Sequence, residues 1–247
     1  MADFLIRKLE NFARLSAEDR AALDRASRQR TRQVRPRDDI VREGDGPGET
    51  SLILDGWACR YKTLEDGRRQ IIAYLLPGDL CDHGVSVLRE TDHAIGSLTA
   101  VTLAEIPAGT VQQLAGGQTR LAQALTWEAQ VAAAIQREWT VNIGQRTAFE
   151  RLGHLLCELY LRLHAVGLTQ GPTCELPLTQ AEIADTIGLS VVHVNRTLQE
   201  LRGAGLIALR GRELTLHRLD ALQRAVQFNP NYLHLDHEGR HLDANET

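Results

Sequence analysis

The sequence contains no apolar run near the length that a membrane-spanning helix requires. The first stretch, Met1 to Arg20, alternates charged residues with Leu and Phe, which is the pattern neither of a signal peptide nor of a transit peptide. We therefore expect a cytoplasmic protein that makes no contact with a membrane.

Cysteine is scarce, and its positions exclude several kinds of site. The four cysteines lie far apart and form no C-x-x-C pair, so their spacing predicts no structural zinc site. A cytoplasmic setting also disfavours disulfides. We interpret Cys59, Cys81, Cys157 and Cys174 as buried or idle thiols.

The signature motifs of common enzymes are missing as well. The chain has no P-loop, no G-x-S-x-G, no zinc-hydrolase pattern and no dinucleotide-binding fingerprint. We therefore expect no enzyme, no catalytic residue and no metal ligand.

Lysine occurs only at Lys8 and Lys62, so that nearly every basic residue is Arg. This bias is typical of a GC-rich genome and is no evidence for DNA binding by itself. The net charge of −4 does not exclude DNA either, because a nucleic-acid contact needs only a local basic face.

Glycine is abundant in the first half of the chain. Between Arg32 and Pro107, glycines separate short runs of β-forming residues, and Asp66-Gly67 is a good hairpin turn. Ahead of them, Ser16 and Asp19 resemble a capping box at the start of a helix. Over residues 1–117 the pattern predicts short helices and an antiparallel β-roll, of the cupin-like jelly-roll kind, in an α+β chain.

A long helix is predicted over residues 118–144. Apolar and small residues recur along one of its faces, which fits either packing on the helix's own domain or a dimer seam, and periodicity alone does not separate the two. The seam candidates are Leu121, Leu125, Ala132, Ile135 and Trp139.

Residues 145–222 carry the strongest local signals. After an amphipathic helix over residues 146–166, Thr179 and Glu182 form a capping box, Gly188 supplies a tight turn, and Ser190 can cap a second helix. Two short helices joined by a Gly-containing turn predict a helix-turn-helix unit. Residues 223–247 are expected to form a C-terminal tail that is polar and mobile beyond Phe228-Asn-Pro230.

The second helix, Val191 to Arg202, has a polar outward face, and a basic turn between two strands follows it as a wing. Arg suits guanine, Asn can pair with adenine, and valine methyls can meet a thymine methyl. From His193 to Arg218 there are five Arg against two Glu, an excess that suits contact with phosphates. The predicted DNA-binding residues are Thr179, Ser190, Val191, Val192, His193, Asn195, Arg196, Gln199, Arg210 and Arg212. A winged helix used only for protein contacts is the alternative.

The order of these parts resembles the Crp/Fnr family of bacterial transcription factors, and above all the subgroup common in rhizobia and other alphaproteobacteria. The likeness extends over roughly residues 5 to 220. The residues on which this likeness rests are Val41-Arg-Glu-Gly-Asp45, Leu54-Asp-Gly56, Leu76-Pro-Gly-Asp-Leu80, Leu178 to Leu201, and Gly205-Leu-Ile207.

The resemblance implies a homodimer joined through the long helix, which binds a palindromic double-stranded operator and acts with RNA polymerase. Arg196 stands where the family's base-reading Arg is found. Val192 replaces a glutamate that is common in the family's recognition helix, so the half-site is expected to differ.

The sensor departs from the cyclic-AMP-binding members of the family, which hold the nucleotide with a Gly-Glu pair and then an Arg-Ser pair. Asp82-His83 and His93-Ala94 occupy these places, and an aspartate repels a phosphate. With no cysteine before Cys59, the N-terminal cluster of the oxygen-sensing branch is missing as well. We predict no cofactor and disfavour cAMP and an iron–sulfur cluster. An effector of unknown identity would meet Leu80, Cys81, Asp82, His83, His93 and Ala94.

Two further interpretations stay open. Cys81, His83 and His93 could hold haem or a metal, and His234, His237 and His241 could hold a metal in the tail; ordinary loop and solvated-tail residues are the preferred reading of both sets. A small-molecule or redox sensor that acts through protein contacts is the alternative function, and it would show no salt-dependent DNA affinity.

Overall fold

The computed structural model describes residues 1–46, 48–81, 89–116 and 119–235. The chain divides into two compact units. The roll unit comprises Met1–Lys62, Ala73–Ala133 and the chain from His234, and the winged unit comprises Thr63–Ile72 and Ala134–Leu233. Each unit is described by itself.

Two helices open the roll unit, α1 (Asp3–Glu10) and α2 (Ala17–Arg28). The capping box predicted for α2 is present, because the Ser16 side chain accepts from the Asp19 amide while the Asp19 carboxylate accepts from the Ser16 amide. A third helix, α3 (Ala108–Ala115), was not expected. Its N-cap is Pro107, which offers no side-chain hydrogen bond, so the sequence carries no cap signal there.

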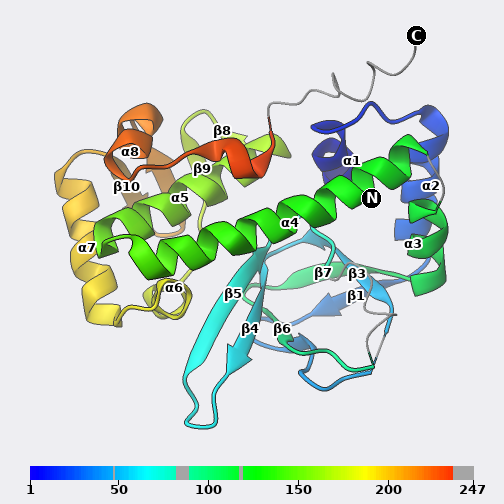
Figure 1. Cartoon of the computed structure of the whole chain (residues 1–247), viewed down its shortest axis with the longest axis horizontal. Coiled ribbons are helices and arrows are strands. Elements are labelled where there is room, and N and C mark those ends of the chain that lie inside the picture. Colours follow the sequence, from blue (N-terminus) through cyan, green and yellow to red (C-terminus); the bar gives the residue numbers. More distant parts are fainter. Residues whose placement is uncertain (47, 82–88, 117–118, 236–247) are drawn as a thin grey trace. The chain divides into compact units, whose positions relative to one another are not determined.

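The expected antiparallel β-roll is confirmed (Figure 1). One sheet has the order β1 (Thr31–Val34), β7 (Val101–Ile106), β3 (Thr50–Asp55), and the other has the order β2 (Asp39–Val41), β6 (Ala94–Ser97), β4 (Ala58–Thr63), β5 (Arg69–Leu75). One core cluster of the roll includes Val34, Ile53, Ile95 and Leu103. Successive residues of β3, β6 and β7 are buried, so side chains on both faces of these strands are covered within the unit.

A second core joins α1 to the start of α4 (Arg120–Gln145), which begins close to its predicted position. Within this unit, Lys8 Nζ lies 2.7 Å from Asp79 Oδ1 and also bonds to Glu128 of α4. Burial alone would lower the pKa of Lys8, but the two carboxylates raise it. The ammonium group of α1 is therefore shared by two buried carboxylates, one from the turn after β5 and one from α4.

The winged unit is built on α5 (Ala148–Ala165), whose N-cap Thr147 forms a capping box with Glu150. Its four-stranded sheet has the order β10 (Ile207–Arg210), β11 (Glu213–Leu216), β9 (Thr173–Glu175), β8 (Thr169–Gln170). The wing strands β10 and β11 match the prediction. Strands β8 and β9 were missed, because each is only two or three residues long and carries no alternating pattern.

The expectation of a mobile tail beyond Phe228-Asn-Pro230 is wrong for the residues that the structure describes. Helix α8 (Leu219–Ala225) leads into a 3₁₀ turn, Pro230–Leu233, in which Tyr232 and Leu233 are buried. A Cβ atom at Gly153 of α5 would lie 2.5 Å from Val226 Cγ1, so a glycine there allows this segment to pack closely. We call residues 226–233 the strap.

The strap closes a buried polar network. Glu158 of α5 is wholly buried and accepts hydrogen bonds from Trp139 Nε1 at 3.0 and 3.1 Å, from Tyr232 Oη at 2.9 Å and from Arg162 Nη1 at 3.4 Å. Burial raises the pKa of Glu158 although all three donors oppose it. Three side chains therefore donate to one carboxyl group that is itself wholly buried.

Candidate nucleic-acid interface

The first helix of the predicted motif is α6 (Gln180–Ile187), and both halves of its predicted capping box are formed. Thr179 Oγ1 accepts from the Glu182 amide at 3.2 Å, and Glu182 Oε2 accepts from the Thr179 amide at 2.7 Å. Ile183 and Ile187 are buried, as the apolar spacing predicts. Thr179 thus fixes the start of α6.

The turn after α6 depends on Gly188, whose φ of 66° is left-handed and whose amide donates to the Ala184 carbonyl. Two residues later, Ser190 Oγ accepts from the His193 amide at 3.2 Å and caps the second helix, α7 (Val191–Gly203). Every element of the predicted helix-turn-helix is therefore present.

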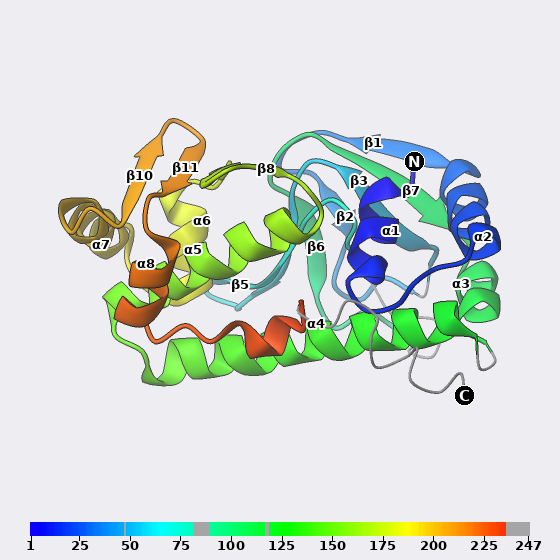
Figure 2. The same cartoon turned by 90° about the horizontal axis from the view of Figure 1, so that it is seen from above.

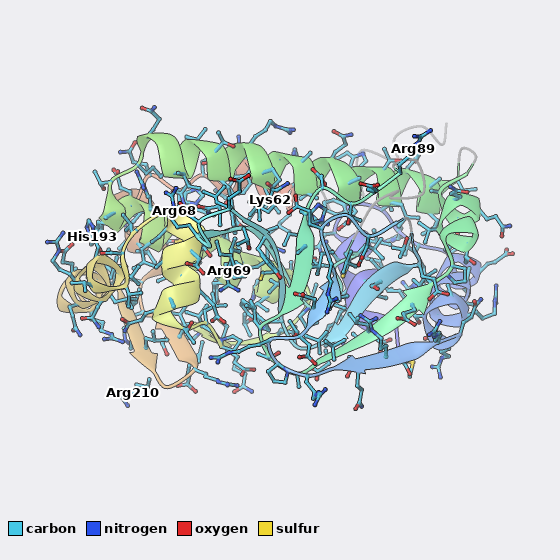
Figure 3. The ribbon with its side chains drawn as sticks, turned by 90° about the horizontal axis from the view of Figure 1, so that it is seen from below. Lys62, Arg68, Arg69, Arg89, His193 and Arg210 are labelled. Carbon is cyan, nitrogen blue, oxygen red and sulfur yellow. The ribbon has the colours of Figure 1, made fainter. Side chains whose placement is uncertain are left out.

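Helix α7 divides into a buried face and an outward face. Val194, Leu198 and Leu201 are buried, with exposed fractions of 1% or less. Val192 is 81% exposed, so its methyl groups lie on the surface of the helix. The predicted base-contacting residues on the outward face are Val191, Val192, Asn195, Arg196 and Gln199, all exposed, and His193, which is half-buried (Figure 3).

Arg196 has polar neighbours on its own helix. Its Nη2 lies 2.9 Å from His193 Nε2 and its Nε lies 3.7 Å from Glu200 Oε1, while the side chain stays 67% exposed. Asn195 Nδ2 donates to Gln180 Oε1 of α6 at 3.3 Å. Glu200 and Gln180 were missed by sequence reasoning, although the i, i+4 spacing of Arg196 and Glu200 could have indicated the first pair.

The wing is the β10–β11 hairpin, which turns at Gly211 with a φ of 60° (Figure 2). Arg210 and Arg212 flank this glycine, and both are exposed. Arg202 and Arg218, by contrast, donate to the backbone carbonyls of Leu209 and Ala204. The predicted positive excess therefore lies at the surface at Arg196, at Arg218 and at the tip of the wing, whereas Arg202 is half-buried.

Comparison with known proteins identifies these parts. A model described as Crp-like helix-turn-helix domain matches residues 150–225, and one described as cyclic nucleotide-binding domain matches residues 31–117. The nitrogen fixation regulation protein FixK of Azorhizobium caulinodans is 32% identical over 176 residues, which cover 70% of this chain and 69% of that protein. The chain belongs to the Crp/Fnr family.

Other relatives place this Crp/Fnr chain among transcriptional regulators rather than enzymes. The transcriptional activator protein FnrL of Cereibacter sphaeroides is 29% identical over 213 residues, which cover 85% of this chain and 84% of that protein. The solved structure of FixK2 from Bradyrhizobium japonicum matches with a TM-score of 0.69 at 24% identity, over 79% of this chain and 96% of that one, and supports the fold.

The structure describes the predicted seam residues on α4 of this Crp/Fnr protein in a single copy. Leu121 and Leu125 belong to the core cluster with α1, and Ile135 and Trp139 are 8% and 6% exposed within a single chain. Ala132 is half-buried. A helical period marks a face but not what covers it; α1 contributes to the core around Leu121 and Leu125, and the seam itself stays a prediction. The opposite face of α4 carries exposed Gln123, Thr126, Gln130, Arg137, Thr140, Val141 and Gly144.

The predicted effector residues of the Crp/Fnr roll are only partly described. Leu80 and Cys81 belong to the two core clusters, His93 Nδ1 lies 2.8 Å from Asp92 Oδ1, and Ala94 opens β6 as a buried residue. Asp82 and His83 lie outside the described residues. Because two of the six residues lie outside the described ranges, the effector site stays a prediction.

The described parts of the Crp/Fnr chain contain no group of three or more His, Cys, Asp or Glu side chains placed to hold a metal. The ring of His234 packs against Trp127 of the same unit, with centroids 5.9 Å apart, while His237 and His241 lie outside the described residues. No helix in the described ranges is long and apolar enough to cross a membrane.

Proposed function

We propose that the chain binds a palindromic operator in the cytoplasm as a homodimer, and that α7 of each copy enters a major groove to control transcription by RNA polymerase. The observation that carries this proposal is the exposed face of α7. It presents two valine methyl groups, an amide and a guanidinium on a helix whose start is fixed by Ser190. These groups suit thymine, adenine and guanine edges respectively.

The homodimer is supported by α4. Its face opposite the core holds only one charged residue, Arg137, among exposed small and polar residues, and Val141 there is 46% exposed. Small and uncharged side chains allow two helices to approach closely. Two-fold symmetry through this face would give one recognition helix to each half-site.

The environment of His93 and Ala94 supports the prediction that the sensor does not bind cyclic AMP. Where the family's Arg-Ser pair would hold the phosphate, His93 is engaged with Asp92 and Ala94 supplies only a buried methyl group. A cyclic phosphate needs a guanidinium or free amide groups at that place. We propose that operator binding by this chain does not depend on cAMP or on an iron–sulfur cluster.

Replacement of Arg196 tests the base-reading role. We expect Arg196→Ala to weaken operator binding by about 1–3 kcal/mol and to relax preference at one base pair, because a bidentate contact with guanine is lost. Arg35→Ala on the roll unit is the matched control, since its side chain is 90% exposed and lies outside the interface. Unchanged operator affinity in Arg196→Ala would contradict the assignment.

Replacement of Arg212 tests phosphate contact by the wing. We expect Arg212→Ala to weaken binding to operator and random DNA alike, and to reduce the slope of log K against log salt by about 1. The measurement is a salt titration of both DNAs by fluorescence anisotropy. An effect confined to one operator sequence would instead make Arg212 a base-reading residue.

A further inference from the structure

The start of β5, in the β4–β5 hairpin, lies against the helix-turn-helix within the winged unit. We call residues Thr63–Ile72 the flap. Arg69 Nε lies 2.9 Å from Asp185 Oδ2 of α6, and Gln70 Nε2 donates to the Thr186 carbonyl oxygen at 2.9 Å (Figure 3). The Ile72 carbonyl in turn accepts a hydrogen bond from Gln136 of α4. The flap therefore forms hydrogen bonds with both α6 and α4.

These contacts complete the C-terminal end of α6. The last four carbonyls of a helix have no partner within it, and the helix dipole places partial negative charge there. Ala184 accepts from the amides of Gly188 and Leu189, Thr186 from Gln70, and Ile187 from Arg151 Nη1 of α5 at 3.2 Å. The flap therefore supplies one of the partners, and the Arg69 guanidinium adds a cation beside the same helix end.

The hydrogen bonds from the flap lie close to the turn that joins α6 to α7. Thr186 stands two residues before Gly188, the left-handed turn that sets the direction of α7. The outward face of α7 remains exposed while the flap is bonded, so the contact is compatible with DNA binding. Arg69 and Gln70 also share the backbone of β5, which continues to Leu75 in the sheet of the roll.

We propose that the flap is a positioning element for the recognition helix, and that Arg69 and Gln70 hold the end of α6 so that α7 meets the operator in the correct orientation. This inference rests on the proposed DNA-binding function. In this proposal Arg69 and Gln70 contribute to operator recognition by supporting α6, without contacting a base themselves.

A charge exchange tests the proposal in the full-length protein. Arg69→Asp and Asp185→Arg should each weaken operator binding roughly tenfold while random-sequence DNA is bound within about threefold of the native level, and the double variant should regain most of the loss. Arg68→Asp is the matched control: it makes the same charge change one residue earlier, but Arg68 pairs with Asp66 inside the flap. Equal losses in Arg68→Asp and Arg69→Asp, or no recovery in the double variant, would overturn the proposal.

Hydrogen exchange without DNA separates this inference from the DNA-binding proposal. In Arg69→Asp the amide protons of Gly188 and Leu189 should exchange faster than in the native protein, whereas those of α5 should not change. Unaltered exchange at the turn would contradict the positioning role. If the amides exchange faster in Arg69→Asp but the native protein binds no operator, the contact between the flap and α6 is supported and the proposed DNA-binding function is refuted.

Discussion

Glu158→Ala should lower the free energy of unfolding of the winged unit by about 3–5 kcal/mol. The carboxyl group is wholly buried and accepts from Trp139, Tyr232 and Arg162. Its removal takes a charged acceptor from the buried Trp139 and Tyr232 and from the guanidinium of Arg162. The loss would be measured as a shift of the urea unfolding midpoint at constant m-value.

Glu158→Gln is the control for this prediction. The amide oxygen can still accept from Trp139 and Tyr232, and because burial raises the pKa of Glu158, the fold tolerates an uncharged group there. We expect the glutamine variant to lose clearly less stability than the alanine variant. Equal losses in the two variants would show that the charge of Glu158, rather than its capacity to accept hydrogen bonds, holds the strap.

Acidification should destabilise the winged unit through His154. This side chain is wholly buried, its ring lies 4.7 Å from that of Phe228 and stacks on that of Tyr232, and burial together with Arg146 lowers its pKa to about 3. Glu138 Oε1 lies 3.2 Å from His154 Nε2, but the same oxygen lies 2.6 Å from Arg146 Nη2. Because Arg146 compensates the charge of Glu138, burial determines the direction in which the pKa of His154 shifts.

The direction of this change in stability with pH follows from proton linkage. The unfolded chain takes up the His154 proton near pH 6.5 and the folded chain only near pH 3, so the stabilisation is complete above pH 6.5 and is lost as the pH falls toward 3. The whole window corresponds to about 4–5 kcal/mol, since one pKa unit is worth about 1.4 kcal/mol. Urea unfolding between pH 7 and 5 should therefore show a decline that is smaller in His154→Phe, which cannot titrate. Parallel declines in both proteins would refute the role of His154.

The helix-turn-helix could be predicted from the sequence almost residue by residue. Its signals are local: Thr179 caps with Glu182 three residues away, Gly188 turns the chain, and Ser190 caps α7 through the amide of His193. Such interactions are encoded within a few residues, so spacing alone reveals them. The glycine-separated strands of the roll could be predicted for the same reason.

Interactions between distant parts of the chain could not be predicted in this way. Leu121 and Leu125 repeat as a dimer seam would, but α1, more than a hundred residues earlier, covers them. Tyr232 meets Glu158 across 74 residues, and Arg69 meets Asp185 across 116. Nothing in the spacing of the strap or of the flap indicates these partners, so the sequence predicts a mobile tail for the strap and only a hairpin turn for the flap.

The most direct test of the account is a selection of genomic DNA fragments by the purified protein with no ligand added. The account predicts enrichment of a palindrome whose half-sites are centred about 10 base pairs apart, one helical turn of DNA, and loss of that enrichment in Arg196→Ala. Recovery of an asymmetric site would contradict the dimer. A protein that retains no fragment above the level of random DNA would contradict operator recognition by α7.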